Sequence, residues 1–96
     1  MLHTLNCSPG HPALQDCLGL LCAEDALLLL GDGVYLALAQ SSNGEALQAT
    51  GAALYVLEAD ARATGVYARL APGFTLVDDA GFVTLTERHA RQMAWY

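Results

Sequence analysis

The sequence contains no lysine, and its only basic side chains are four arginines, Arg62, Arg69, Arg88 and Arg91. Ten acidic residues bring the formal net charge to −6 at pH 7. A protein that binds DNA or RNA directly needs several cations to displace counterions from the phosphates. Because this chain cannot supply such a patch, we expect no direct contact with nucleic acid.

Long apolar runs and targeting segments are also missing. The apolar run 26–30, like every other apolar run in the sequence, is far shorter than the roughly 18–20 residues that cross a bilayer. The opening MLHTL has neither the basic nor the apolar region of a secretory signal. We therefore expect a cytoplasmic protein that does not enter the membrane and that keeps its three cysteines as free thiols.

Charged residues are scarce as well. They make up 15% of the chain, against roughly 25% in an average soluble domain, whereas hydrophobic residues reach 54%. A chain of 96 residues forms one small domain, placed at 1–96, with a large surface for its volume. The core cannot hold all of the apolar side chains. We expect a partner subunit to cover the excess and the chain to self-associate when alone.

Strand and helix patterns alternate along the chain. Short apolar runs bounded by glycine, proline or polar residues predict strands at 2–5, 26–30, 53–57 and 74–77. Helices are expected from Pro12 through an apolar stripe that includes Cys17, and at 34–39, 46–49, 58–64 and about 79–89. This alternation predicts βαβ units and a mostly parallel sheet with helices on both faces.

Local signals add detail at the ends of these elements. Asp32 in the GDG turn and Asp78 or Asp79 are expected to cap the helices that follow them, and Gly65 to end the helix before it. The polar stretch 41–45 is expected to be flexible. The tail QMAWY carries the only tryptophan, which predicts that the tail docks on its own sheet or on a partner.

Two of the three cysteines, Cys17 and Cys22, lie in the segment QDCLGLLC. On a helix they are about 140° apart, so they can neither share an ion nor form a disulfide. Cys7 and His11 have the spacing of two zinc ligands, but no second pair at zinc spacing follows. We therefore expect no metal site, and we expect no cofactor.

The three thiols differ in their sequence surroundings. Cys17 is in mid-helix beside Asp16 and on the apolar stripe, with no cation to favour its thiolate, which is typical of a core residue. Cys22 is at the negative end of the same helix. Cys7 leaves the first strand ahead of a helix, at the sheet edge where ligands collect in α/β folds. From the residues alone, Cys7 is the best candidate for a reactive thiol.

Other motifs are weaker. GDG supplies two glycines of a dinucleotide fingerprint but not the third, and a tight turn explains it. His3 falls within a predicted strand, and no Ser, Cys or Asp stands at a triad spacing from His11 or His89, so we expect these histidines to be structural. A small-ligand module that uses the loop edge at Cys7 and GDG remains an alternative.

Three segments together resemble the TusB/DsrH family of sulfur-relay subunits, namely MLHTLNCSP, DALLLLGDGVY and GFVTLTERHARQMAW. The similarity runs from Met1 to Trp95, in the family's order and at nearly its spacing. It implies an α/β fold of the flavodoxin-like or Rossmann type. This is a three-layer sandwich with a mostly parallel sheet of 4–5 strands and helices on both faces.

The resemblance also implies a function. Such a subunit belongs to a dimer of heterotrimers with TusC/DsrF-type and TusD/DsrE-type paralogues, and the relay cysteine is on the TusD/DsrE-type chain. The complex passes persulfide sulfur toward 2-thiolation of the tRNA wobble uridine. We expect this chain to be a scaffold or accessory subunit that is not catalytic alone. The alternative is a DsrH-type subunit of a sulfur-oxidation relay, with Cys17 as an accessory persulfide carrier.

The family pattern bears on the cysteines. DsrH-type members carry a helix cysteine in the setting of Cys17, between ALQD and LGLL, and some TusB-type members lack it. Cys7 stands where the family often has a basic residue, so the resemblance gives it no role. The resemblance therefore favours Cys17 as the candidate site residue, location favours Cys7 as the runner-up, and Cys22 is expected to be dispensable.

Overall fold

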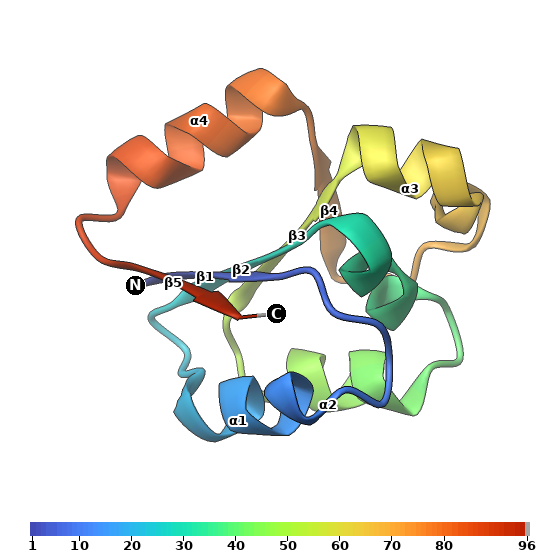
Figure 1. The fold of residues 1–96 in the computed structure, drawn as a ribbon, viewed down its shortest axis with the longest axis horizontal. Coiled ribbons are helices and arrows are strands. Elements are labelled where there is room, and N and C mark those ends of the chain that lie inside the picture. Colours follow the sequence, from blue (N-terminus) through green and yellow to red (C-terminus); the bar gives the residue numbers. More distant parts are fainter. Residues whose placement is uncertain (96) are drawn as a thin grey trace.

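The computed structural model describes residues 1–95 and contains a five-stranded, all-parallel sheet (Figure 1). The strands are β1 (Leu2–Leu5), β2 (Ala26–Leu29), β3 (Ala53–Leu57), β4 (Phe74–Val77) and β5 (Gln92–Trp95), in the order β4-β3-β2-β1-β5. The helices are α1 (Pro12–Leu20), α2 (Ser42–Ala49), α3 (Glu58–Thr64) and α4 (Asp79–Arg88), with two 3₁₀ helices, η1 (Gly31–Ala37) and η2 (Val66–Arg69). The flavodoxin-like α/β fold is confirmed.

The path of the chain explains the layers. From β1 to β4 the chain steps across the sheet in one direction, and α4 then returns it to the opposite edge, where β5 pairs with β1. Right-handed crossovers place a helix on opposite faces when the direction of travel reverses. Accordingly, α1 and α2 lie on one side of the sheet and α4 lies on the other (Figure 1). The tail docks on its own sheet, as one of the two predicted alternatives, because β5 pairs with β1. Tyr96 lies outside the described residues.

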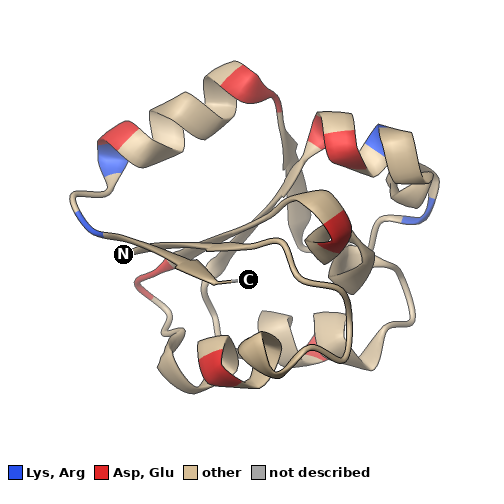
Figure 2. Cartoon of the chain, in the orientation of Figure 1, with Lys and Arg blue, Asp and Glu red and all other residues tan. Residues whose placement is uncertain are grey.

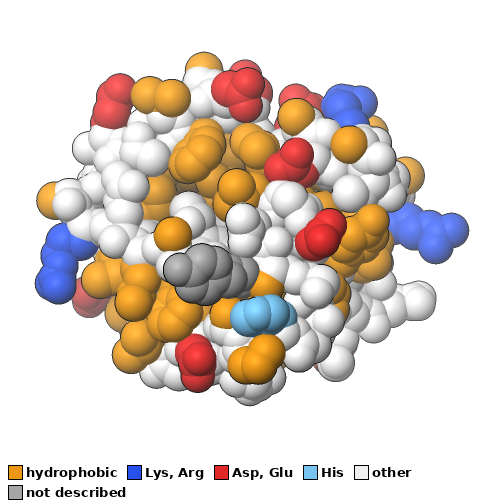
Figure 3. Space-filling view, viewed as in Figure 1, with side chains coloured by type: hydrophobic (Ala, Val, Ile, Leu, Met, Phe, Trp, Pro, Cys, Tyr) orange, Lys and Arg blue, Asp and Glu red, His pale blue; other side chains and the backbone are white. Residues whose placement is uncertain are grey.

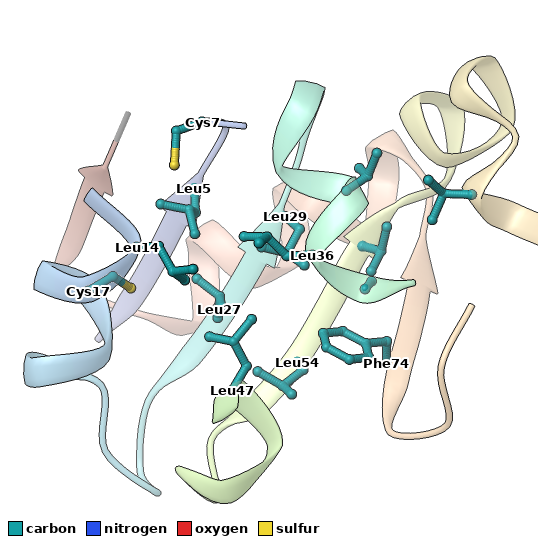
Figure 4. Packing of buried hydrophobic residues seen from close by; sticks show 14 of the residues in the cluster. Leu5, Cys7, Leu14, Cys17, Leu27, Leu29, Leu36, Leu47, Leu54 and Phe74 are labelled. Atoms are coloured by element: carbon teal, nitrogen blue, oxygen red, sulfur yellow. The ribbon is translucent and has the colours of Figure 1, made fainter. Parts of the chain in front are cut away.

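The two faces of the sheet carry unequal cores. The larger core joins α1, α2 and η1 to the sheet, and Figure 4 shows its leucines and Phe74 packed together. On the α4 side, the buried hydrophobic cluster within residues 1–95 has four members, Leu2, Ala26, Leu28 and Leu85. All of β2 is buried, as its continuous apolar run predicts for a central parallel strand. The face of the sheet that α4 covers therefore has only a small core.

At the start of α1 and of α2, the side chain of the residue before the helix accepts a hydrogen bond from a free backbone N–H group of the first turn. The His11 Nδ1 accepts a hydrogen bond from the Ala13 N–H at 3.0 Å and caps α1. Ser41 caps α2 by accepting the N–H of Gly44. The stretch 41–45, expected to be flexible, instead forms the cap and first turn of α2, so this helix is longer than the predicted 46–49. A serine cap explains the difference.

The predicted cap at Asp32 is wrong. η1 begins at Gly31, one residue before Asp32, and its N-cap Leu30 has no side-chain hydrogen bond. The Gly31 N–H is bonded instead to the Asp60 carboxylate of α3, at 2.7 Å. A Cβ atom at Gly33 would overlap the carbonyl oxygen of Leu5, so this glycine lets η1 pass close to the end of β1. Close packing therefore explains GDG.

The other two predicted helix ends are confirmed. Gly65 is the C-cap of α3 and adopts the left-handed conformation, with φ of 83°. Asp78 caps α4, because its Oδ1 accepts the Gly81 N–H at 2.7 Å. The last helix ends at Arg88, with His89 as its C-cap.

We expect Asp78→Ala to lower the free energy of unfolding by about 1 kcal/mol, because it removes the cap of α4. The matched variant Asp32→Ala is expected to change it by less than about 0.5 kcal/mol, since Asp32 is exposed and caps nothing. Urea denaturation of both variants measures the difference. An equal loss in the two would contradict this assignment of the caps.

Candidate functional site

Cys17 lies in the larger core, with no exposed surface (Figure 4). Burial raises the pKa of its thiol to about 11, and the nearby charges of Cys7 and Asp25 act in the same direction. At neutral pH the side chain is therefore a protonated thiol that solvent cannot reach. The apolar stripe of α1 faces the core, as the sequence predicts. In this conformation Cys17 cannot attack a substrate.

Cys7 follows β1 at the carboxyl edge of the sheet, as its position in the sequence predicts, but it is only 7% exposed. Burial raises the pKa of this thiol, and a backbone hydrogen bond opposes the change without cancelling it. The side chain points into the same core as Leu5 (Figure 4). The location is therefore favourable for chemistry, but the environment favours an unreactive thiol.

Cys22 is the exposed cysteine. It lies beyond the end of α1 at Leu20, and its S–H donates a hydrogen bond to Oδ2 of Asp25 at 3.3 Å. The structure thus places Cys7 and Cys17 in one core and Cys22 on the surface, beside a carboxylate.

A polar cluster that the sequence analysis missed surrounds Asp25. His3, on β1, is 1% exposed and accepts a hydrogen bond at Nδ1 from the Trp95 indole N–H, at 3.1 Å. An indole nitrogen can only donate, so the proton of the neutral His3 ring is on Nε2. Nε2 lies 3.1 Å from Oδ2 of Asp25 and donates to it. The His3 and Trp95 rings are nearly parallel, with 14° between their planes.

Asp25 also binds the amino terminus. Its Oδ1 is 3.1 Å from the Met1 ammonium, and its Oδ2 accepts the Cys22 N–H at 3.2 Å. Burial by itself would raise the pKa of Asp25, but the hydrogen bonds from Met1, His3 and Cys22 outweigh it and hold that pKa well below its usual range. We call Met1, His3, Asp25 and Trp95 the terminal clasp, because they join both ends of the chain to the sheet.

An open hollow of about 310 Å³ lies beside the terminal clasp, and Leu20, Arg91 and Met93 complete its lining. The clasp can hold a proton on His3 and a charge on Asp25, but His3 has both ring nitrogens engaged. The cluster therefore has a structural role in this conformation. The only signal for this cluster in the sequence is the two-residue period of side chains along a strand. His3 pairs with Met93, so Trp95, two residues later, lies on the same face of the sheet as His3.

The remaining residues that the sequence singles out, His11 and the GDG turn, occupy structural positions. Within residues 1–95, no three His, Cys, Asp or Glu side chains gather closely enough to hold a metal ion. The His11 Nδ1 is occupied as a helix cap, and Gly33 is explained by its contact with Leu5. None of the helices in the described part of the chain has the length and apolar character needed to span a membrane.

Comparisons with known proteins decide the family. A family model described as "DsrH like protein" matches residues 7–92. Protein TusB of Yersinia pestis (strain Pestoides F) is 42% identical over 95 residues, which cover 99% of this chain and 100% of that protein. Protein TusB of Yersinia pseudotuberculosis (serotype O:1b, strain IP 31758) is similar to the same extent. The chain belongs to the TusB/DsrH family.

A solved structure agrees with the fold of this TusB/DsrH-family chain. The crystal structure of the ychN protein from E. coli superposes with a TM-score of 0.83 and covers 97% of this chain and 96% of its own. Only 17% of the residues are identical, so the likeness is evidence for the fold alone.

We expect Asp25→Asn to lower the free energy of unfolding by roughly 2 kcal/mol at pH 7, because it leaves the Met1 ammonium without a charged partner. The folded state holds the pKa of Asp25 below its usual range, so the stabilisation is present above about pH 4 and is lost as the pH falls. The difference in the free energy of unfolding between wild type and Asp25→Asn should therefore become smaller at acidic pH.

Urea denaturation between pH 7 and pH 3 measures this gap. The matched control is Glu24→Gln, which neutralises the exposed carboxylate next to Asp25 in the sequence and should change stability by less than about 0.5 kcal/mol. A gap that is the same at both pH values would contradict the role given to Asp25.

Proposed function

We propose that this chain is a scaffold subunit of a cytoplasmic sulfur-relay complex that passes persulfide sulfur toward 2-thiolation of the tRNA wobble uridine. The full-length identity of 42% with proteins named TusB supports the pathway. The partners we propose are a TusC/DsrF-type and a TusD/DsrE-type paralogue, in a dimer of heterotrimers. Sulfur would travel on the TusD/DsrE-type subunit.

One observation carries the scaffold role. Cys17 has no exposed surface, and its thiol pKa is raised to about 11. To carry sulfur, a Cys17 thiolate would have to attack the terminal sulfur of a donor persulfide, break its S–S bond and release the donor thiolate. Burial opposes both the ionisation and the approach of the donor. The chain's contribution is therefore the surface that it offers to its partners.

The chain's excess of apolar residues supports the same role. Exposed large apolar side chains occur on several elements, among them Leu20, Val83 and Met93. Ordinary monomers tolerate single residues of this kind. In a subunit with only 15% charged residues, however, they offer surface that a partner can bury.

A second candidate keeps Cys17 in the chemistry. In a DsrH-type sulfur-oxidation relay, Cys17 would be an accessory persulfide carrier, and the family model that matches residues 7–92 includes this position. Such a role requires α1 to move when the complex assembles, so that the thiol becomes accessible and a partner cation lowers its pKa. Cys7, the runner-up, has a slightly exposed side chain and would need a smaller rearrangement.

Replacement of Cys17 by alanine separates the two roles. Alanine keeps the site apolar and is expected to cost only about 1 kcal/mol of stability. For a scaffold subunit, a Cys17→Ala complex with its two paralogues should assemble and support the same level of 2-thiouridine in tRNA as wild type. Size-exclusion chromatography and mass spectrometry of tRNA nucleosides measure the two properties.

Cys7→Ala and Cys22→Ala are the matched controls, one buried in the same core and one exposed. Normal assembly with poor thiolation in Cys17→Ala alone, together with an added sulfur on the wild-type peptide that contains Cys17, would establish the relay role instead. An added sulfur on the Cys7 peptide would transfer that role to Cys7.

A further inference from the structure

The α4 side of the sheet leaves five apolar side chains only partly buried. They come from β3, from β4, from the residue that follows β2 and from the first half of α4, and are Leu30, Tyr55, Leu57, Val77 and Phe82. These residues surround the small core on this face, to which α4 contributes Leu85 (Figure 1). Figure 3 shows apolar surface between α4 and α3.

Acidic side chains border this surface. Because β2, β3 and β4 are parallel, the residues that follow them meet at one edge of the sheet. There the chain places Asp32 after β2, Glu58 and Asp60 in the first turn of α3, and Asp78 and Asp79 at the start of α4. Figure 2 shows these acidic positions together at the ends of the three elements. We call the five apolar and five acidic residues the acidic-rimmed patch.

Contacts and a hollow show that the rim is continuous. Asp60 is bonded to Gly31 next to Asp32, and an open hollow of about 270 Å³ is lined by Glu58, Asp78 and Asp79. The only cation in the lining of that hollow is Arg62, and it is paired with Glu58 at 3.1 Å. The remaining carboxylates have no basic partner among the residues that the structure describes.

We propose that the acidic-rimmed patch docks a protein partner that presents apolar side chains surrounded by lysine and arginine. The apolar centre offers surface to bury, and the rim selects a partner of opposite charge. This inference rests on the proposed function, because the partner it assigns is one of the two paralogous subunits of the relay complex.

Charge excludes a second copy of this chain as the occupant. A symmetric pair would bring the same patch together from both copies, so the two acidic rims would face each other. The other faces of the chain share only four arginines and no lysine, which are too few to match a rim of five carboxylates. The patch therefore fits a different chain, and its attraction for that chain should weaken as salt increases.

Charge reversal at the rim tests the proposal. Asp32 and Asp79 are both exposed, and neither makes a hydrogen bond to another described side chain, so Asp32→Lys/Asp79→Lys changes charge without removing a cap. Association of the double variant with each purified paralogue is followed by biolayer interferometry at low and high salt. Association with one paralogue should be roughly tenfold slower at low salt and depend less on salt than in wild type.

The matched control is Asp16→Lys/Glu45→Lys, which makes the same change of charge on α1 and α2, at the other face of the sheet. It should associate at nearly the wild-type rate. Circular dichroism checks that both variants are folded. The salt dependence of wild-type association tests the charge argument without any variant, and reversal of a basic residue on the partner should restore binding of Asp32→Lys/Asp79→Lys.

The remaining outcomes overturn the proposal in distinguishable ways. If the wild-type complex forms and both double variants match it at every salt concentration, the docking surface is wrong and the proposed function stands. If the wild-type chain binds neither paralogue, the proposed function fails and this inference fails with it. If the isolated chain dimerises and Asp32→Lys/Asp79→Lys alters that dimer, the occupant is a second copy.

Discussion

The hydrogen bond from the Trp95 indole to His3 determines how the two ends of the chain meet. It places the histidine proton on Nε2, and that proton reaches Asp25, which in turn holds the Met1 ammonium. β5 is an edge strand in which Gln92, Met93 and Ala94 are exposed, so Trp95 is the β5 side chain that packs against the larger core. The terminal clasp therefore supplies much of what keeps the fifth strand on the sheet.

The distribution of buried residues between the two faces of the sheet also determines how reactive the cysteines are. The larger core takes in Cys7 and Cys17 and raises the pKa of both thiols, whereas the α4 side keeps a small core and leaves apolar side chains near its surface. One face is thus closed and unreactive, and the other is open and bordered by carboxylates. This division between the two faces is what the proposed scaffold role requires.

Much of the fold could be predicted from the sequence, because the first four strands are apolar runs bounded by turn residues. The errors occur where distant segments meet. Asp32 was expected to cap the helix after GDG, but the Asp60 carboxylate of α3 accepts the first N–H of η1 instead, and nothing near Asp32 indicates that contact. The terminal clasp depends on the register of β5 against β1, which no local pattern specifies. Cys7 has the predicted location, and its burial follows from packing that the sequence does not display.

Native-state hydrogen exchange in wild type and in Trp95→Phe tests most directly whether the terminal clasp holds β5. Phenylalanine keeps an aromatic ring but removes the indole N–H that His3 accepts. We expect the amides of β5 and the Leu2 amide, which donates to the Arg91 carbonyl, to exchange roughly tenfold faster in the variant. Amides between β2 and β3 should keep their protection. Unchanged protection of β5 would contradict the central role given to this contact.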